Sequence, residues 1–463
     1  MALKLDLTGM FAAAGSDGAP CREAFAAALP RAAEVRAAHL AAPPAWRQLP
    51  GQRRHLEACR ARAAELRARG DFDALVVLGI GGSALGNAAM VAALAPAYQE
   101  WAPAEGQPRV FLLDSIDPDW IGDFLEAVPV ERCHFNVISK SGGTIETSSE
   151  FLLFYDAVRR AVGSDQAARQ RFTVTTDPAG GHFRALCDEL GFATLEVPAG
   201  VGGRFSVLSP VGLFTAEMAG LDAEGLLAGA ARVNQKLAEC APEEDAALAY
   251  ALAHVLHMEQ GRPIHVHFPY GHRLRLLADW YKQLWAESLG KRFDTQGDEV
   301  NVGPTPVKAV GPTDQHSQVQ LYAEGPDDKV YTLVKLGRHS REIAIPEPFA
   351  ASPAFEYLRG QTLNQLIDAE RQGTEVALLE AGRPLCTIEL CKLDAFHVGQ
   401  YFAFFEIATA YAGGLLGVDP FDQPGVENGK KAALALMGCA GYEALAASIR
   451  ASQASREPFT LEC

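Results

Sequence analysis

The sequence is short of positive charge. It has 41 Lys and Arg residues against 57 Asp and Glu residues, so its formal net charge is −16. Proteins that bind nucleic acid or an anionic membrane need a basic face, and this balance disfavours both classes. Charged residues interrupt the apolar runs well before the about 18 positions of a membrane span. The N-terminus lacks the sustained apolar segment of a signal peptide. We therefore expect no nucleic-acid partner and no membrane partner.

Cysteine is scarce and irregularly placed. The nine cysteines form no CxxC pair and have no regular spacing. An odd, scattered set in a large chain is typical of reduced thiols in a cytoplasmic protein, with most of them serving as small core residues. They stand at positions 21, 59, 133, 187, 240, 386, 391, 439 and 463. We therefore expect a cytoplasmic location.

Apolar sequence, in contrast, is ample. The chain has 463 residues, 48% of them hydrophobic, which suggests two to four domains or one large α/β unit. Short apolar runs alternate with helical stretches, and this alternation indicates βαβ units and parallel sheets. The expected strands of a first sheet are residues 74–79, 110–113, 135–138, 172–175 and 194–197, and those of a second are 264–268, 307–310, 319–322, 330–336 and 385–390.

The remaining segments are expected to be helical. Residues 1–70 are rich in Ala, Arg and Leu at helical spacings, with a break at Pro43 and Pro44. Helices are also expected over 207–261, 399–416 and 425–437. We predict two α/β domains with a boundary near 210–245. The expected divisions are an N-terminal helical segment at 1–70, α/β domains at 71–240 and 241–440, and a C-terminal tail at 441–463.

Two loops that follow expected strands could hold an anion. GIGGSALG at 79–86 lets the backbone approach a ligand and is followed by a helix. It matches a dinucleotide fingerprint only loosely, and a simple tight turn is the alternative. SKSGGTIET at 139–147 combines hydroxyls, glycines and a lysine at a strand-to-helix junction, which favours a phosphate cradle. It is not a Walker A loop, and a cluster of helix-capping residues is the alternative.

Two further segments offer a cation and a base. Arg204 follows two glycines and could point its permanent charge toward a developing oxyanion, although surface arginines in salt bridges are more common. Gln283 and Glu287 are four residues apart and share one face of an expected helix. A carboxylate among aromatic and apolar residues could act as a general base. The alternative is an exposed Glu287 paired with Lys291.

Histidines and a late lysine complete the set of candidates. His316 lies in a polar turn and could transfer protons, although a lone loop histidine is commonly an ordinary surface residue. His265, His267 and His272 are weak candidates for metal ligands, because they lack partner Cys or carboxylates at fixed offsets. FDQPGVENGKK at 421–431 opens a helix at a Pro- and Gly-containing turn and places Lys430 on its first turns. Solvated charge is the alternative for this lysine.

Taken in order, these segments resemble the glucose-6-phosphate isomerase family, also called phosphoglucose isomerase. The resemblance extends from about residue 70 to 440. Its most specific parts are GGRFSVLSPVG at 202–212 and FDQPGVENGK at 421–430, and GIGGS, SKSGGT, ESLGK and DQHSQ match the remaining site segments. The family's fold implies two doubly wound sugar-isomerase domains of the SIS type, with helical segments at both ends.

The resemblance also implies an activity and residue roles. The activity is interconversion of glucose 6-phosphate and fructose 6-phosphate in glycolysis and gluconeogenesis, without a metal or an organic cofactor. Glu287 would transfer a proton between C2 and C1 through a cis-enediol, and Arg204 would stabilise the enediolate. His316 and Lys430 would assist ring opening. The residues that would hold the phosphate are Ser139, Lys140, Ser141 and Thr144, and those that would line the sugar are Gly82, Ser83, Gln283 and Gln423.

In this family the equivalent of His316 comes from the neighbouring subunit, so the resemblance implies a homodimer. Leu289 and Pro424 depart from the Asn and Trp of many members, and either change could alter sugar selectivity. Two alternatives remain open at this point. One is an isomerase that also accepts mannose 6-phosphate, and the other is a non-catalytic sugar-phosphate sensor. The joint presence of Glu287, His316 and Lys430 argues against the sensor.

Overall fold

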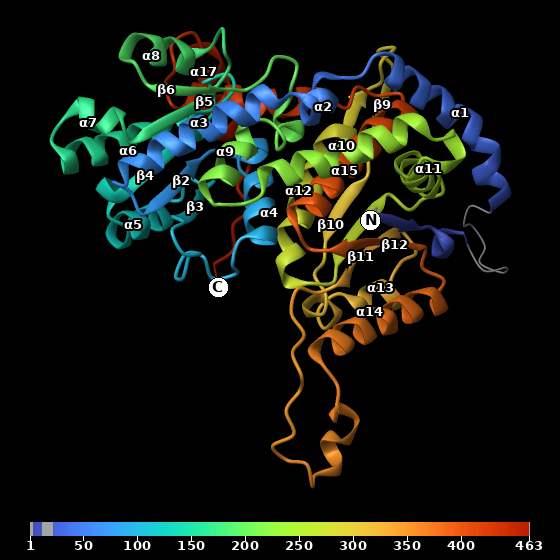
Figure 1. The fold of residues 1–463 in the computed structure, drawn as a ribbon. Helices are drawn as coiled ribbons and strands as arrows, with labels where there is room; N and C mark the ends of the chain where they lie inside the picture. The colour runs from blue at the N-terminus through green and yellow to red at the C-terminus, as the bar shows by residue number, and fades with distance from the viewer. Residues whose placement is uncertain (1–2, 12–21, 463) are drawn as a thin grey trace.

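Two open sheets organise the chain in the computed structural model, which describes residues 3–11 and 22–462 (Figure 1). The first sheet has five parallel strands in the order β3-β2-β4-β5-β6. Its strands are β2 (Ala74–Leu78), β3 (Arg109–Leu113), β4 (Cys133–Ile138), β5 (Phe172–Thr176) and β6 (Ala193–Glu196). Every residue of β2, β4 and β5 is buried, as the continuous apolar runs require in a sheet covered on both faces.

Helices cover both faces of the first sheet. On one face, Phe151 and Phe154 of α6 pack against strand residues such as Phe135 and Phe172. The helices on this face are α5 (Pro118–Ala127), α6 (Ile145–Val162), α7 (Asp165–Arg169) and α8 (His182–Leu190). The opposite face carries α3 (Arg53–Arg69), α4 (Leu85–Leu94) and α9 (Pro210–Met218). The expected first doubly wound sheet is therefore confirmed.

The second sheet repeats this plan with one difference. Its order is β1-β12-β11-β7-β10, and all neighbours are parallel except β1 and β12, which are antiparallel. The strands are β1 (Lys4–Asp6), β7 (Ile264–Pro269), β10 (Thr305–Lys308), β11 (Lys329–Arg338) and β12 (Leu385–Lys392). The N-terminal segment, expected to be helical, thus also supplies an edge strand. A separate antiparallel pair is formed by β8 (Lys291–Phe293) and β9 (Glu299–Val302).

Helices cover this sheet as well. One face carries α13 (Val319–Glu324) and α14 (Leu363–Glu380), and the other face lies against a core built by α10 (Ala223–Glu239), α11 (Ala246–Glu259), α12 (Arg275–Leu289) and α15 (Ala395–Leu415). The strand predicted at 319–322 is wrong, because these residues begin α13. Val319 and Tyr322 are three residues apart and turn inward on one helix face, and a four-residue apolar run does not distinguish the two structures.

The N-terminal layer consists of α1 (Arg22–Ala41), α2 (Ala45–Gln48) and α3, and the predicted break at Pro43 and Pro44 separates α1 from α2. The core that contains α9, α10 and α15 is continuous from one sheet to the other. The division of the chain at residues 70, 240 and 440 therefore stays a prediction. Cys59, Cys133, Cys187 and Cys386 are buried free thiols. Cys21 and Cys463 lie outside the described residues.

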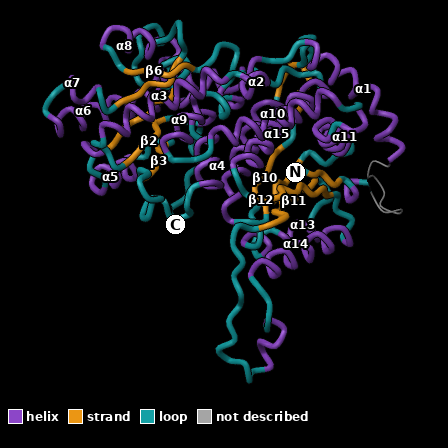
Figure 2. Tube along the Cα trace, viewed as in Figure 1, coloured by secondary structure: helices purple, strands orange, loops and turns teal. Residues whose placement is uncertain are grey.

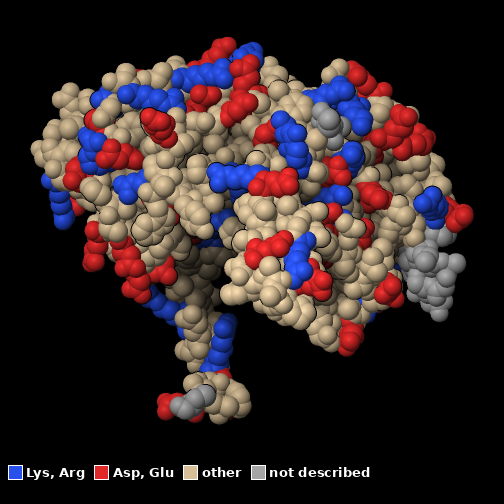
Figure 3. All heavy atoms as spheres, turned by 60° about the horizontal axis from the view of Figure 1, so that its bottom comes forward, with Lys and Arg blue, Asp and Glu red and all other residues tan. Residues whose placement is uncertain are grey.

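Two segments leave the body of the molecule. Residues 339–362, called the arm below, extend from β11 to α14 mostly as loop (Figure 2). The C-terminal helices α16 (Glu427–Leu436) and α17 (Glu443–Ala454) are exposed along most of their length. Acidic and basic side chains are interspersed on the face drawn in Figure 3. Within the described ranges, no helix is both long and apolar enough to span a bilayer.

Candidate active site

The two glycine-rich loops lie side by side at one edge of the first sheet. They follow β2 and β4, which are neighbouring strands, and the helices after them, α4 and α6, cover opposite faces. An open α/β sheet binds its ligands at such a point. A side chain on Gly79 would place its Cβ 3.3 Å from the carbonyl oxygen of Ile138 and 2.9 Å from the Cβ of Ser83. Glycine therefore lets the two loops meet.

The predicted phosphate loop is shaped by its own hydroxyls. The amide of Gly142 donates to Ser139 Oγ at 3.1 Å, and Ser139 Oγ lies 3.3 Å from Thr144 Oγ1. The amide of Gly143 donates to Ser141 Oγ at 3.2 Å. Ser139 is buried, whereas Ser141 is exposed and Thr144 is half-buried at the start of α6. Ser139 thus orders the loop, while Ser141 and Thr144 can face an anion beside the helix N-terminus.

Lys140 connects this loop to the segment that carries Arg204. Its Nζ donates to the carbonyl oxygen of Val201 at 3.0 Å. Gly142 has a φ of +67°, and a Cβ there would lie 2.5 Å from the amide nitrogen of Phe183. The loop is thus fixed against the start of α8 on one side and against residues 201–205 on the other.

Backbone contact joins the first glycine loop to η5 (Gly203–Phe205). A Cβ on Gly82 would lie 2.3 Å from the carbonyl carbon of Gly203. Gly81, with a φ of +59°, lies against the side chain of Gln283 on α12, whose Nε2 would be 3.0 Å from a Cβ. The loop after β2, the helix η5 and α12 therefore converge in one place. Ser83 lies in this loop, at the end of η3 (Gly81–Ser83).

Glu287 is held at this meeting point by two donors. Arg204 Nη1 lies 3.0 Å from Glu287 Oε1, and Gln283 Nε2 donates to Glu287 Oε2 at 3.0 Å. The predicted four-residue spacing on α12 is what brings the amide and the carboxylate together. The Arg204 side chain is 5% exposed and that of Glu287 is 25% exposed. The alternative, an exposed Glu287 paired with the Lys291 ammonium, is not what the structure shows.

The loop after α15 completes the surroundings of Arg204. Its Nη2 donates to the carbonyl oxygens of Pro420 and Asp422 at 3.1 and 3.0 Å, and its Nη1 donates to Gln423 Oε1 at 3.1 Å. Burial lowers the pKa of Arg204 below its ordinary value, and the Glu287 carboxylate opposes that shift. An arginine in such a network stays charged. The guanidinium therefore joins η5, α12 and residues 420–423 around one positive charge.

Sequence reasoning missed two residues of this cluster. Ser288, fully buried, accepts a hydrogen bond from Arg204 Nε at 3.0 Å. Lys291 Nζ donates to the carbonyl oxygens of Glu287 at 3.0 Å and of Asp422 at 2.8 Å, and burial lowers its pKa. Both residues stand in the ESLGK segment, so the motif was a signal for them. The neighbouring Leu289 is fully buried.

Among the described residues, His316 and Lys430 make no hydrogen bond or ion pair with this cluster. His316 is exposed just after η8 (Thr313–Gln315), and its imidazole has no hydrogen-bond partner in the described part of the chain. Lys430 Nζ pairs with Glu427 at 2.9 Å on α16, and its side chain is 59% exposed. The chain thus brings together Gly82, Gln283, Glu287, Arg204 and Gln423. It does not bring His316 or Lys430 to them by a hydrogen bond or ion pair among the described residues.

Of the three histidines considered as metal ligands, His265 and His267 are buried on β7 and bonded there, and His272 is exposed. His265 Nδ1 accepts a hydrogen bond from Trp285 Nε1 at 2.8 Å, and His267 Nε2 lies 2.6 Å from the hydroxyl of Tyr401. Burial lowers the pKa of His267 to about 3. Over residues 3–11 and 22–462, no group of three or more His, Cys, Asp or Glu side chains is arranged to hold a metal ion.

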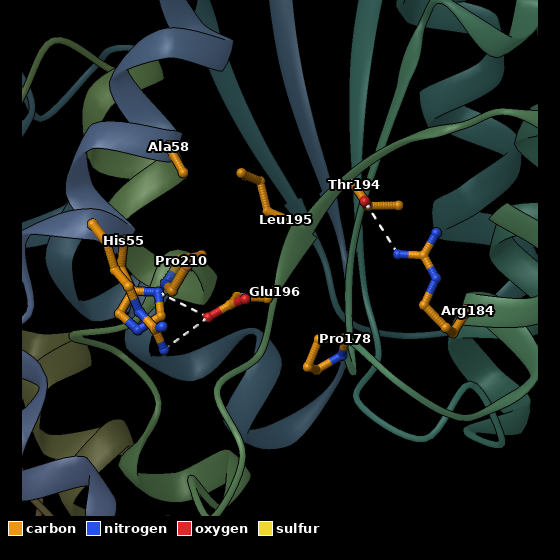
Figure 4. Close-up of a pocket in the computed structure, with 9 residues that line it drawn as sticks. His55, Ala58, Pro178, Arg184, Thr194, Leu195, Glu196 and Pro210 are labelled. Atoms are coloured by element: carbon orange, nitrogen blue, oxygen red, sulfur yellow. Dashed lines mark hydrogen bonds and ion pairs between the residues drawn. The ribbon is translucent and has the colours of Figure 1, made fainter. Parts of the chain in front are cut away.

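A separate cavity of about 310 Å³ lies beside the β6 edge (Figure 4). Its wall includes Glu196, whose carboxylate lies 3.3 Å from His55 Nδ1 and 3.4 Å from Arg54 Nη2, and Arg184, which bonds Thr194. Its lining contains none of the predicted site residues, and these charged groups are already paired within the wall. The cavity is therefore distinct from the cluster around Arg204.

Comparison with known proteins places this arrangement in a family. The family model described as phosphoglucose isomerase matches residues 42–454. A glucose-6-phosphate isomerase of Rubrobacter xylanophilus is 44% identical over 402 residues, which cover 87% of this chain and 91% of that protein. One from Carboxydothermus hydrogenoformans is 45% identical, with 81% of each chain covered. The crystal structure of a hypothetical protein from Thermus thermophilus superposes with a TM-score of 0.83 at 37% identity, over 95% of this chain and 100% of that one. The chain therefore belongs to the phosphoglucose isomerase family.

Proposed function

We propose that the chain interconverts D-glucose 6-phosphate and D-fructose 6-phosphate through a cis-enediol intermediate. The relatives named glucose-6-phosphate isomerase support this activity. The observation that carries the mechanism is the orientation of Glu287, whose two carboxylate oxygens face Arg204 and Gln283 at 3.0 Å each. A base oriented in this way beside a permanent cation suits proton transfer next to a carbonyl.

In the proposed reaction, the Glu287 carboxylate removes the proton from C2 of the open-chain aldose. The electron pair of the C2–H bond forms the C1–C2 double bond, and the carbonyl electrons move to O1. Arg204 stabilises the negative charge of this enediolate. The proton of the O2 hydroxyl passes to O1, the carbonyl forms again at C2, and Glu287 returns its proton to C1. This sequence gives the ketose without gain or loss of electrons.

The loop of residues 139–144 is the proposed phosphate site. The hydroxyls of Ser141 and Thr144 and the start of α6 would bind the phosphate, with Lys140 and Ser139 fixing the loop around it. Gly82, Ser83, Gln283 and Gln423 would line the sugar between this loop and Glu287. Binding energy from the phosphate would position C1 and C2 at the carboxylate, as remote contacts do in other enzymes.

Ring opening is the proposed role of His316 and Lys430, with His316 of the partner subunit reaching the site. Two observations support a homodimer. His316 and Lys430 are exposed, and neither bonds a residue of the Glu287 cluster within the described part of the chain. The arm also carries exposed apolar side chains, among them Phe349 at 68% and Tyr357 at 73% exposure. A projecting apolar segment of this kind is typical of an interface between copies.

A cytoplasmic location fits free cysteines and a reaction of glycolysis and gluconeogenesis. The isomerase names of the relatives disfavour a non-catalytic sensor. They also name glucose 6-phosphate rather than mannose 6-phosphate, so neither alternative is part of the proposal.

The substitution Glu287→Gln tests the proposal. It keeps the shape and the Arg204 contact but removes the base, so kcat should fall by about 10³-fold with little change in KM. In D2O, the wild-type enzyme should exchange the C2 hydrogen of glucose 6-phosphate during turnover, and the variant should not. Glu299→Gln, on exposed β9, is the matched control. A near-normal rate in the Glu287→Gln enzyme would show that Glu287 is not the base.

A further inference from the structure

An aromatic cluster lies beneath the Arg204 segment. Trp46 of α2 is 3% exposed, and its ring stacks on that of Phe205 with centroids 5.0 Å apart and planes 24° apart. The ring of Phe421 meets Phe205 edge-on at 5.4 Å and lies 6.5 Å from Trp46. The three rings therefore form one contact between the N-terminal layer, η5 and the loop after α15.

These rings hold the same two segments that Arg204 joins. Phe205 follows Arg204 directly in η5, and Phe421 stands between Pro420 and Asp422, whose carbonyl oxygens accept from the guanidinium. Two kinds of contact therefore fix the distance between η5 and residues 420–423. The guanidinium fixes it through hydrogen bonds, and Trp46 fixes it by packing against both aromatic side chains.

Trp46 contacts its neighbours by ring packing and not by a hydrogen bond from the indole N–H. Its indole Nε1 is buried and has no hydrogen-bond partner among the described residues. The short helix α2 is itself anchored, because Asn234 Nδ2 of α10 donates to the carbonyl oxygen of Arg47 at 2.8 Å. On the other side, the Cβ of Ala45 lies within 3.2 Å of where a Cβ on Gly200 would be. Trp46 is thus a fixed support and not a mobile side chain.

We propose that Trp46 is a positioning residue for the reaction, one that acts through Phe205 and Phe421 on Arg204 and Gln423. It is 3% exposed, so the proposal assigns it no contact with the substrate. Its ring sets where the guanidinium stands relative to Glu287, and small displacements of such a group lower the rate of the chemical step. The inference rests on the proposed function, since it assigns Trp46 to the placement of the proposed enediolate cation.

The test is a pair of substitutions at one position. Trp46→Phe keeps an aromatic face and loses no hydrogen bond, so kcat should stay within about twofold of wild type. Trp46→Leu removes the stacked ring, and kcat should fall by about tenfold. The inhibition constant of inorganic phosphate should change less than about twofold in both variants, because the ring contacts of Trp46 are with His39, Phe205 and Phe421, none of which belongs to the phosphate loop. Trp101→Leu is the matched control, since Trp101 is 88% exposed.

A purely structural role predicts a different pattern. Trp46→Leu would then lower the melting temperature, while the folded fraction kept its wild-type kcat, and that result would overturn the proposal. An equal loss in kcat and in phosphate affinity would also overturn it, because it would show a general disturbance. Should Trp46→Leu not fold, Phe421→Leu carries the test. Phe421 is 39% exposed, and its loss should lower kcat by about threefold with phosphate inhibition unchanged.

The proposed base, Glu287, and the proposed positioning residue, Trp46, can be tested independently. If Glu287→Gln keeps a normal rate, the proposed chemistry is wrong whatever Trp46 does. If Glu287→Gln is inactive while Trp46→Leu and Phe421→Leu both keep wild-type kcat, only the positioning role is wrong. The double variant Trp46→Leu with Phe421→Leu sharpens this result. Its loss should be close to that of Trp46→Leu alone, because both residues act through one stack.

Discussion

The two parts of the proposed site differ in how far one chain completes them. Arg204 is bonded to residues of α12 and of the loop after α15, and it fixes Glu287 and Gln423 in one cluster. His316 and Lys430 are exposed, and the imidazole has no bonding partner in the described ranges. One chain therefore preorganises the Arg204–Glu287 part of the site, and the proposed dimer would supply the imidazole that this part lacks.

The two sheets teach a related lesson. In the first sheet, β2 has β3 on one side and β4, the next strand in sequence, on the other. In the second sheet, β7 has β10 on one side and β11 on the other in the same way, so β7 corresponds to β2. The first sheet offers its loops after β2 and β4, whereas the second offers the helix that follows β7. This helix is α12, which carries Gln283 and Glu287. The candidate site is therefore built from the equivalent points of two similar sheets, used in different ways.

The largest effect in this comparison is expected at Arg204. Arg204→Lys keeps the charge, but an ammonium cannot reach the carboxylate, the hydroxyl and the backbone carbonyls together. We expect kcat to fall by about 10²–10³-fold in a coupled assay. Arg132→Lys, which alters an exposed bidentate pair with Asp73, is the control and should stay near wild type. A near-normal Arg204→Lys enzyme would show that the charge alone suffices.

Mixing variant subunits tests whether the exposed His316 acts in the site of its own subunit or in that of the partner. His316→Gln should lower kcat by about 10²-fold. When His316→Gln and Glu287→Gln subunits are denatured and reassembled together, half of the dimers are mixed, and each mixed dimer has one intact site if the imidazole crosses the interface. The mixture should then recover about a quarter of wild-type activity. A mixture as inactive as its two parents would place His316 in its own subunit's site.

The sequence predicts those features of the fold and the site that a short segment encodes, and it does not predict contacts between distant segments. The parallel strands of both sheets were found because a buried parallel strand leaves a short apolar run in the sequence. The strand β1 was not, because three residues of alternating burial pair with β12 from the far end of the chain. The glycine loops and the face of Glu287 were predicted from spacing. Ser288 and Lys291 were not, since their roles depend on Arg204 and Asp422, far away in sequence.

A smaller effect is expected at the phosphate loop. Ser141→Ala with Thr144→Ala removes two hydroxyls from the proposed cradle but leaves Ser139 and the start of α6. KM for glucose 6-phosphate should rise by about tenfold or more while kcat changes by less than about threefold. Ser149→Ala, an exposed serine further along α6, is the control. Unchanged inhibition by inorganic phosphate in the double variant would contradict the cradle.

The smallest effect concerns stability near the same loop. Glu150 of α6 is 4% exposed, and its Oε1 has no partner in the described chain. Burial, with Asp114 and Glu146 nearby, raises the pKa of Glu150 to about 8. Because the folded pKa lies above the unfolded value of about 4.3, the folded state binds the extra proton and stability falls as pH rises between these values. The helix that follows the phosphate loop thus carries a buried carboxyl that is destabilising at high pH.

Glu150→Gln removes that titration and keeps the size of the side chain. The gain in stability over wild type, followed as the melting temperature, should be absent near pH 4, grow through neutral pH and level off above about pH 8. In free energy of unfolding the gain should be on the order of a few kcal/mol at most, because water entry and local relaxation reduce the penalty of a buried charge. The exposed Glu126→Gln should show no such pH dependence. A gain of equal size at pH 4 and pH 8 would mean that packing, and not the charge of Glu150, sets the difference in stability, and the buried carboxylate would then not destabilise the helix that follows the phosphate loop.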